Sequence, residues 1–232
     1  ITLHAYRVAP RAQSGSADPT CPLILLHGNG EDMHYFAHQL HALNTTREVI
    51  ALDSRGHGES PRGSAPLTLA QMSDDLAAFM DDNDIAQADL LGFSDGGNVA
   101  LIFALTHPER VHKLILNGAN LEPRGLKTSV LLPILLEHRL TKDPARKELL
   151  GLMADEPHIP LTALAEVRMP VLVVAGTRDM IKESHTRAIA DALPNATLSL
   201  IEGDHFVAAT NPDAFNACVL AFLEDEQQVA GA

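Results

Sequence analysis

The sequence predicts an α/β fold built around a mostly parallel, doubly wound sheet. Short, mainly apolar runs such as Leu23 to Leu26, Lys113 to Leu116 and Pro170 to Ala175 suit strands that are buried on both faces. Segments with a helical pattern separate these runs, and alternating strands and helices favour parallel strands joined by right-handed crossovers. The 232 residues fit one unit, since α/β folds run to roughly 200–250 residues. We therefore expect a single domain over residues 1–232.

Strands and helices alternate along the first half of the chain. We expect strands over residues 2–8, 23–26, 48–52, 89–93 and 113–116, and helices over 31–43, 68–82 and 99–105. The apolar residues of the helix at 68–82 follow the 3, 4, 7 spacing of one buried face. Thr68 and Gln71 match a capping box at its start. The polar segment from Pro10 to Thr20 predicts a turn or loop.

Two helical stretches follow each other between residues 119 and 169, with no strand pattern between them. They run over 129–140 and 144–154, and Asp143 followed by Pro144 is typical of an N-cap and a first helical position. The alternation then resumes, with strands at 170–175 and 196–201 and helices at 183–193 and 211–226. We interpret residues 119–169 as a short helical lid inserted into the α/β domain, not as a second domain.

Net charge and hydrophobicity restrict the kinds of partner that the protein can bind. The net charge of −13 at pH 7 would repel nucleic acids and anionic membranes. No apolar run approaches the roughly 18–20 residues that a membrane span needs. We therefore expect a small-molecule substrate, with neither nucleic acid nor membrane as a partner.

The cysteines and the start of the chain bear on the compartment. Cys21 and Cys218 lie far apart in the sequence, and we expect reduced thiols in a cytoplasmic protein, with a single bridge between them as the alternative. No leader pattern precedes the first strand, and the chain begins at Ile1. We expect a cytoplasmic location from the cysteines, with a leader removed before Ile1 as the alternative.

A Gly-x-Ser-x-Gly sequence, from Gly92 to Gly96, lies where an apolar strand ends and an apolar helix begins. Gly92 and Gly96 lack Cβ atoms, so the backbone can turn tightly around Ser94 and let the helix pack close to the strand. The pattern predicts an exposed Ser94 hydroxyl at a helix N-terminus. The same five residues also fit an ordinary glycine-rich turn, so the choice depends on the rest of the chain.

The groups that a nucleophilic serine needs also follow predicted strands. Asp179 and His205 come after the last two strands, and the carboxyl ends of parallel strands meet at one edge of a sheet. His205 would take the proton of the Ser94 hydroxyl, and Asp179 would orient the imidazole. The backbone N–H groups of Asn29 and Asp95 would stabilise the negative charge of a tetrahedral intermediate. The sequence therefore predicts a catalytic triad and an oxyanion hole.

Five segments together resemble the α/β-hydrolase fold serine hydrolases. They are His27-Gly28-Asn29-Gly30, Asp53-x-Arg55-Gly56-His57-Gly58-x-Ser60, Gly92-x-Ser94-x-Gly96-Gly97, Gly176-x-x-Asp179 and Gly203-Asp204-His205, in family order over essentially the whole chain. The resemblance implies the same triad, the same two oxyanion donors and no cofactor. The predicted lid is shorter than in many relatives, which leaves the choice of substrate open.

Asp95, directly after the predicted nucleophile, bears on the substrate. The sequence Ser94-Asp95-Gly96-Gly97 is similar to that of valacyclovirase-type hydrolases, a resemblance that implies a contact between this carboxylate and the α-amino group of amino-acid esters. A carboxylate near the acyl pocket could pair with an ammonium group. The alternative is that Asp95 only occupies a helix N-terminus, where a negative charge is favoured.

Other residues near these segments have competing interpretations. Met33, Tyr35 and Phe36 follow the oxyanion loop and are candidates for lining the substrate pocket, with core packing as the alternative. Asp204 is a poorer candidate for the triad acid than Asp179, because neighbours in sequence rarely point the same way. Asn120 and Glu122 lie where some relatives keep their acid, but no aspartate is present there.

Histidines are numerous near the predicted site. His27 and His57 are expected to stabilise loops. Three further histidines share one expected helical face with metal-like spacing: His34, His38 and His41. They lack a carboxylate or cysteine in matching register, so we expect no metal.

The leading functional hypothesis is an enzyme that hydrolyses small carboxylic esters through an acyl-Ser94 intermediate. The same triad also serves aminoacyl esters, thioesters, lactones, carbon–carbon bond hydrolysis and cofactor-free perhydrolysis in this fold. A dehalogenase is disfavoured, because dehalogenases of this fold resemble members with an aspartate in place of Ser94. The alternative from another class is a non-catalytic ligand-binding protein on the same scaffold.

Overall fold

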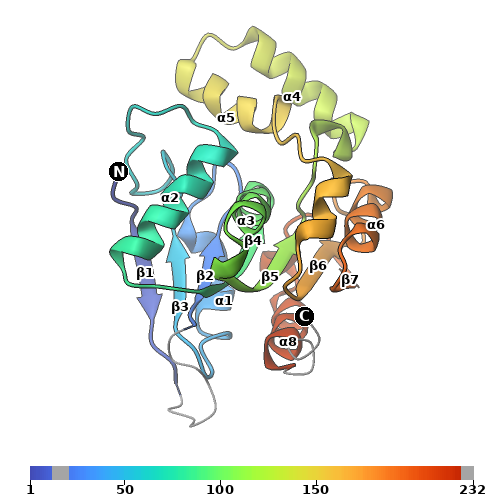
Figure 1. The fold of residues 1–232 in the computed structure, drawn as a ribbon. Coiled ribbons are helices and arrows are strands. Elements are labelled where there is room, and N and C mark those ends of the chain that lie inside the picture. Colours follow the sequence, from blue (N-terminus) through green and yellow to red (C-terminus); the bar gives the residue numbers. More distant parts are fainter. Residues whose placement is uncertain (12–20, 226–232) are drawn as a thin grey trace.

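The structure is a computed structural model that describes residues 1–11 and 21–225 (Figure 1). It confirms the α/β architecture with a mostly parallel, doubly wound sheet. The loop predicted between Pro10 and Thr20 falls almost entirely outside the described residues. No helix of the described part is long and apolar enough to cross a membrane.

In the described part of the chain, seven strands form one sheet in the order β1-β3-β2-β4-β5-β6-β7. Their bounds are β1 Ala5–Val8, β2 Leu23–Leu26, β3 Val49–Leu52, β4 Ala88–Phe93, β5 Val111–Asn117, β6 Val171–Gly176 and β7 Ala196–Ile201. β1 runs antiparallel to β3, and the other neighbouring pairs are parallel. Strand order reverses between β2 and β4, so the loops after these two strands lie side by side at a topological switch point.

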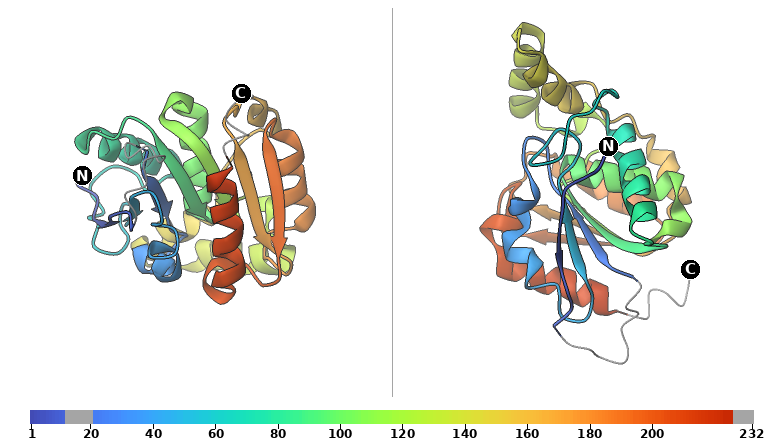
Figure 2. Two further views of the ribbon diagram at one scale, coloured as in Figure 1. Left: turned by 90° about the horizontal axis from the view of Figure 1, so that it is seen from below. Right: turned by 90° about the vertical axis from the view of Figure 1, so that its left-hand side faces the viewer.

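Helices cover both faces of the sheet (Figure 2). They are α1 Ala37–Leu40, α2 Leu69–Asp82, α3 Asp95–Thr106, α6 Glu183–Ala192, α7 Val207–Thr210 and α8 Pro212–Glu224. Leu90 and Leu91 of β4 point into opposite cores, the first shared with α2, α3 and α6 and the second with α1, α7 and α8. Burial on both faces is why the strands read as continuous apolar runs.

Between β5 and β6 the chain forms helices α4 Thr128–Leu140 and α5 Pro144–Ala154, above the carboxyl ends of the parallel strands (Figure 1). Asp143 caps α5 by accepting hydrogen bonds from the N–H groups of Ala145 and Arg146. Helix α5 buries Leu150 and Leu152, whereas α4 buries no residue. That this pair acts as a lid stays a prediction.

The first predicted helix is where the structure departs most from the sequence-based prediction. In place of one helix over 31–43, a 3₁₀ turn at Met33–Phe36 leads into the four-residue α1. Ala42 N and Leu43 N both donate to Gln39 O, which tightens and ends the helix. The Gln39 amide points inward and donates to Ala208 O and Asn216 Oδ1, a contact with the far end of the chain that no local pattern reveals.

Candidate active site

Ser94 lies in a strained turn between β4 and α3. Its backbone φ of 53° and ψ of −119° fall where residues other than glycine are rarely found. The flanking glycines are required by close backbone approaches. A Cβ atom at Gly92 would lie 2.2 Å from Gly96 O, and one at Gly96 would lie 2.1 Å from Leu26 O. The turn is therefore packed so closely that it holds the Ser94 hydroxyl at the N-terminus of α3.

The structure brings Ser94, Asp179 and His205 together from the loops after β4, β6 and β7. His205 Nε2 lies 3.0 Å from Ser94 Oγ, and His205 Nδ1 lies 2.7 Å from Asp179 Oδ1. Asp179 Oδ1 also accepts a hydrogen bond from Ile181 N at 2.8 Å. If Nδ1–H donates to the carboxylate, Nε2 is free to accept the Ser94 proton. This is the geometry of a nucleophile, a base and an orienting acid.

The loops after β6 and β7 lie against each other. A Cβ atom at Gly176 would lie 2.0 Å from Asp204 O, and Arg178 N donates to Gly203 O at 2.8 Å. The Asp204 carboxylate is exposed and accepts a hydrogen bond from Phe206 N at 3.0 Å. Asp204 therefore caps the following turn, while Asp179 contacts His205.

The two predicted oxyanion donors, Asn29 N and Asp95 N, lie in the loop after β2 and at the start of α3, on either side of the switch point. Among the described residues, no hydrogen bond uses either N–H group. The Asn29 side chain is engaged instead: its Nδ2 donates to Asp95 Oδ2 at 2.9 Å and to Leu149 O of α5 at 2.7 Å. Both backbone donors thus remain available for a substrate oxygen.

His27 and His57 support the loops around this site. His27 Nδ1 lies 2.7 Å from Gly28 O, and His27 Nε2 accepts a hydrogen bond from Ser54 N at 3.0 Å. Burial lowers the pKa of His27 to about 4, so its ring is neutral near pH 7 and carries its proton on Nδ1. Burial also lowers the pKa of His57, whose Nδ1 lies 2.9 Å from Arg55 O.

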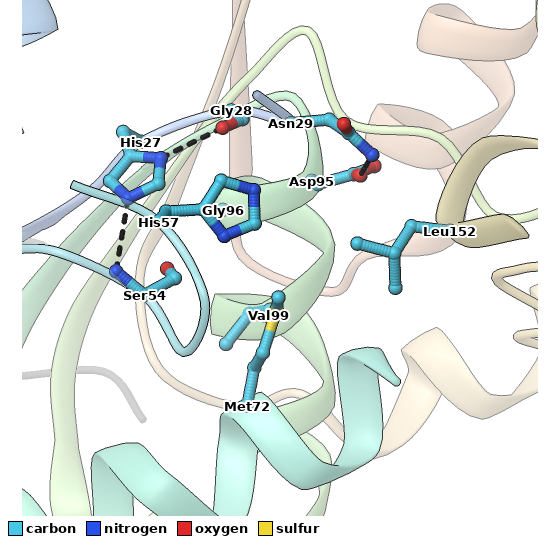
Figure 3. Close-up of a pocket in the computed structure, with 10 residues that line it drawn as sticks. All are labelled: His27, Gly28, Asn29, Ser54, His57, Met72, Asp95, Gly96, Val99 and Leu152. Carbon is cyan, nitrogen blue, oxygen red and sulfur yellow. Dashed lines mark hydrogen bonds between the residues drawn. The ribbon is translucent and has the colours of Figure 1, made fainter. Parts of the chain in front are cut away.

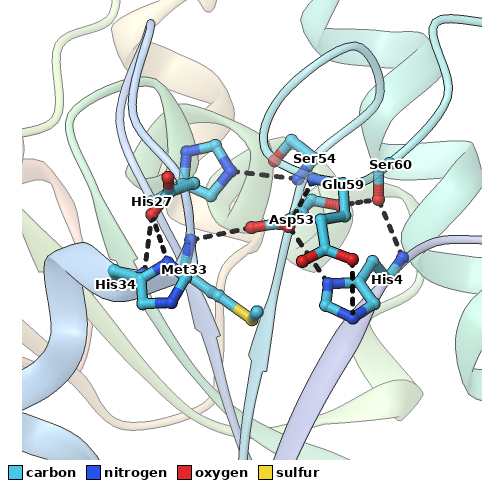
Figure 4. A network of polar contacts seen from close by, with 9 residues as sticks. His4, His27, Met33, His34, Asp53, Ser54, Glu59 and Ser60 are labelled. Atoms are coloured by element: carbon cyan, nitrogen blue, oxygen red, sulfur yellow. Dashed lines mark hydrogen bonds and ion pairs between the residues drawn. The ribbon is translucent and has the colours of Figure 1, made fainter.

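Asp53, at the end of β3, joins three segments (Figure 4). Its Oδ1 accepts a hydrogen bond from Met33 N at 2.8 Å, and its Oδ2 accepts one from Glu59 N at 2.8 Å. Ser60 Oγ donates to Asp53 O and accepts from His4 N. The loop after β3 and the segment after the oxyanion loop are therefore held by one buried carboxylate, which gives the Asp53-to-Ser60 sequence a structural role.

A small cavity lies beside the oxyanion loop (Figure 3). Its volume of about 10 Å³ leaves room for about one water molecule. The lining residues are His27, Gly28, Asn29, Ser54, His57, Met72, Asp95, Gly96, Val99 and Leu152. Met33 and Phe36 are not among them. They are 7% and 0% exposed and pack in the core, so their position gives no support to the prediction that they bind substrate.

The Asp95 carboxylate faces Asn29 and not open solvent (Figure 3). The residue is 6% exposed, and its second oxygen lies 3.4 Å from Asn98 Nδ2. Burial raises the pKa of Asp95 to about 6, against the opposing effect of the Asn29 hydrogen bond. Each carboxylate oxygen already faces one amide, and no contact in the site tests the binding of an ammonium group, so the contact with amino-acid esters stays a prediction.

Replacing Asp95 by asparagine is expected to favour the fold more at high pH than at low pH. A carboxyl group with a raised pKa binds a proton more tightly in the folded than in the unfolded chain, so its contribution to stability falls as the pH rises from about 4 to about 6. The effect of Asp95→Asn on the free energy of unfolding should be more favourable at pH 8 than at pH 4 by about 2–3 kcal/mol, because the amide is uncharged at both pH values. Urea denaturation at pH 4 and pH 8 measures the free energy of unfolding, and Asp82→Asn, at an exposed position of α2, is the control. An equal change at the two pH values would contradict the prediction.

Three further side chains lie near the triad: Glu31 and Asn117, which no sequence pattern marks as site residues, and Tyr35, a candidate pocket residue. Glu31 Oε2 accepts a hydrogen bond from Gly28 N at 3.2 Å, and burial raises the pKa of Glu31 to about 7. Tyr35 stacks on Phe93 at 4.2 Å between ring centroids. Asn117 ends β5, and its carbonyl accepts a hydrogen bond from Ser94 N. The positions of these side chains depend on packing between distant segments, and no short sequence pattern indicates them.

In the described part of the chain, one group of side chains of the types that bind metals lies away from the triad. Cys21, Asp89 and His112 lie at the opposite end of the strands, with potential ligand atoms within 4.8 Å of one another. Asp89 already forms ion pairs with Arg47 and His112, so we assign no cation to this group. Cys21 and Cys218 form no disulfide.

The known proteins that resemble this chain include named hydrolases. The sequence pattern of the alpha/beta hydrolase fold matches residues 22–150. A protein named "Putative carbamate hydrolase RutD", from Caulobacter sp. (strain K31), is 34% identical, with 91% of this chain and 94% of that protein covered. A poly(3-hydroxyalkanoate) depolymerase from Ectopseudomonas oleovorans is 28% identical over 90% of this chain and 86% of its own.

Solved structures share the fold. The enol-lactonase from Burkholderia xenovorans LB400 superposes with a TM-score of 0.81, with 22% identity and 96% of each chain covered. The names of the relatives support a hydrolase activity. The alternating strands and helices, the strained serine turn and the matching family pattern lead to one conclusion: this chain belongs to the α/β-hydrolase fold family.

Proposed function

We propose that this protein is a serine hydrolase that cleaves small carboxylic esters through an acyl-Ser94 intermediate. The observation that carries the proposal is the continuous hydrogen-bonded path from Ser94 Oγ through the His205 ring to Asp179 Oδ1. It joins a nucleophile to a base and fixes the orientation of that base. A non-catalytic binding protein requires neither this hydrogen-bonded path nor the two N–H donors of Asn29 and Asp95, which are unpaired within the described residues.

In the proposed reaction, His205 Nε2 takes the proton of the Ser94 hydroxyl while Oγ bonds to the substrate carbonyl carbon. The carbonyl oxygen becomes an anion that accepts hydrogen bonds from Asn29 N and Asp95 N. The His205 imidazolium then gives its proton to the leaving alcohol, and the carbon–oxygen bond breaks. Water attacks the acyl-Ser94 ester by the same steps and releases the acid.

A second candidate is carbamate hydrolysis by the same triad. The 34% identity to the relative named as a carbamate hydrolase favours it, since that similarity covers nearly the whole chain. A carbamate carbonyl would occupy the same oxyanion hole. Aminoacyl esters, thioesters, lactones and perhydrolysis use the same chemistry, but no contact in the site favours one of them.

Labelling with a fluorophosphonate tests the proposal. The wild-type protein should bind one phosphonyl group at Ser94, and Ser94→Ala should take up none. A panel of ester, thioester, lactone, carbamate and aminoacyl ester substrates should show multiple turnovers that Ser94→Ala loses. Labelling that survives this substitution, or binding without turnover across the panel, would refute the proposed function.

A further inference from the structure

The two residues whose backbone N–H groups would form the oxyanion hole are also joined through their side chains. Asn29 Nδ2 donates to Asp95 Oδ2 at 2.9 Å, and the two side chains point toward each other (Figure 3). Asn29 lies in the loop after β2 and Asp95 begins α3, so the bond spans the switch point of the sheet. This inference rests on the proposed function, because it concerns how that oxyanion hole is held.

The second hydrogen of the Asn29 amide goes to helix α5. Asn29 Nδ2 donates to Leu149 O at 2.7 Å. Helix α5 is itself held against the body, since it buries Leu150 and Leu152 and Glu148 pairs with Arg62. Both protons of one amide therefore connect the oxyanion loop to two other segments, which fixes the orientation of the Asn29 side chain.

The Asp95 end of this bond is fixed as well. Asp95 is buried at the start of α3, and its other oxygen faces Asn98. The Asn98 amide is oriented by Asn120, because Asn98 Oδ1 accepts from Asn120 N at 2.9 Å and Asn98 Nδ2 donates to Asn120 Oδ1 at 3.2 Å. The Asp95 carboxylate thus presents a fixed acceptor to Asn29.

The oxyanion loop needs such an anchor. Asp95 N is held by helix α3, whereas Asn29 precedes the exposed Gly30, which has a φ of 72°. An oxyanion donor must lie within roughly 2.7–3.1 Å of the developing charge, and a misplacement of about 1 Å can cost a factor of about 100 in rate. A bond from the Asn29 side chain to Asp95 fixes the spacing of the two donors.

We propose that Asn29 and Asp95 form a side-chain clamp that sets the geometry of the oxyanion hole, with Leu149 O of α5 as its third member. In this role both side chains are positioning groups, distinct from the contributions of their backbone N–H groups. The Asp95 carboxylate then acts on the hole and not on an ammonium group of the substrate.

The test compares Asn29→Ala, Asp95→Ala, the double variant and Asp95→Asn, which keeps an amide oxygen to accept the Asn29 hydrogen bond. Activity is expressed per Ser94 that a fluorophosphonate labels, so that unfolded protein is not counted. We expect each alanine variant to lower kcat and kcat/KM together by roughly 10–100-fold with little change in KM. The double variant should lose no more than either single one, because the two side chains act as a pair. Asp95→Asn should stay within about threefold of the wild type.

Asn216→Ala is the matched control, since it removes another buried asparagine, in α8 and away from the site. It should lower stability without changing kcat per labelled serine. The proposed clamp would be refuted if Asn29→Ala kept kcat within twofold of the wild type, or if the losses in kcat of the two alanine variants multiplied in the double variant. It would also be refuted if Asp95→Asn lost as much kcat as Asp95→Ala, because the effect would then come from the charge of Asp95. Failure to label Ser94 in the wild type would instead refute the proposed function.

Discussion

Ser94→Ala is expected to lower kcat for a small chromogenic ester by roughly 10⁴–10⁶-fold, because the acyl-enzyme route is lost entirely. The fold should remain, since the strained backbone of this turn is held by the close packing of Gly92 and Gly96 and not by the hydroxyl. Steady-state kinetics together with thermal unfolding measures both effects. Retention of more than a hundredth of the wild-type kcat would contradict a nucleophilic role for Ser94.

A double-variant comparison shows whether Ser94 acts with His205. His205→Ala should cost nearly as much as Ser94→Ala, and the double variant should cost little more than either, because residues of one catalytic unit are not additive. Ser199→Ala, in the middle of β7, is the matched control and should leave kcat unchanged. Losses that multiply would mean that the 3.0 Å contact between Ser94 and His205 has no part in the rate.

Gly96→Ala is expected to destabilise the fold strongly, although it adds only one methyl group. The added Cβ would lie 2.1 Å from Leu26 O and 2.5 Å from His27 O. Both are backbone atoms at the end of β2, in the centre of the sheet, and cannot rotate away. We expect a loss of about 3 kcal/mol or more in the free energy of unfolding, and loss of activity in any protein that folds. Urea denaturation measures the first effect.

Gly151→Ala is the control for that substitution. Gly151 lies inside α5, where the nearest atoms to an added Cβ would be 3.8 Å away. Alanine is the better helix former, so the free energy of unfolding should rise by about 0.5–1 kcal/mol. Equal destabilisation by both substitutions would show that the close approach at Gly96 is not the cause of its effect.

Much of this molecule is readable from local patterns. Continuous apolar runs predicted the central strands, because both faces of a buried strand carry apolar side chains. Thr68 caps α2 and Asp143 caps α5, as the sequence indicates, since a cap depends on neighbouring residues only. The helix predicted over 31–43 is wrong, because the inward-facing Gln39 and the tight turn after it cut the helix short. The predicted capping box forms only in part, since the Gln71 amide lies 3.5 Å from Asp75 Oδ1 instead of facing the Thr68 N–H.

By itself, the sequence determined that Ser94, Asp179 and His205 each follow a strand of a parallel sheet, and topology makes such strand ends converge. The tertiary structure alone decided where the surrounding side chains point. Met33 and Phe36 pack in the core, the Glu31 carboxylate lies against Gly28 N, and the Asp95 carboxylate binds the Asn29 amide. Strand ends follow from periodicity and connection rules, whereas the direction of a side chain depends on packing between segments far apart in the chain, here β2, α3 and α5.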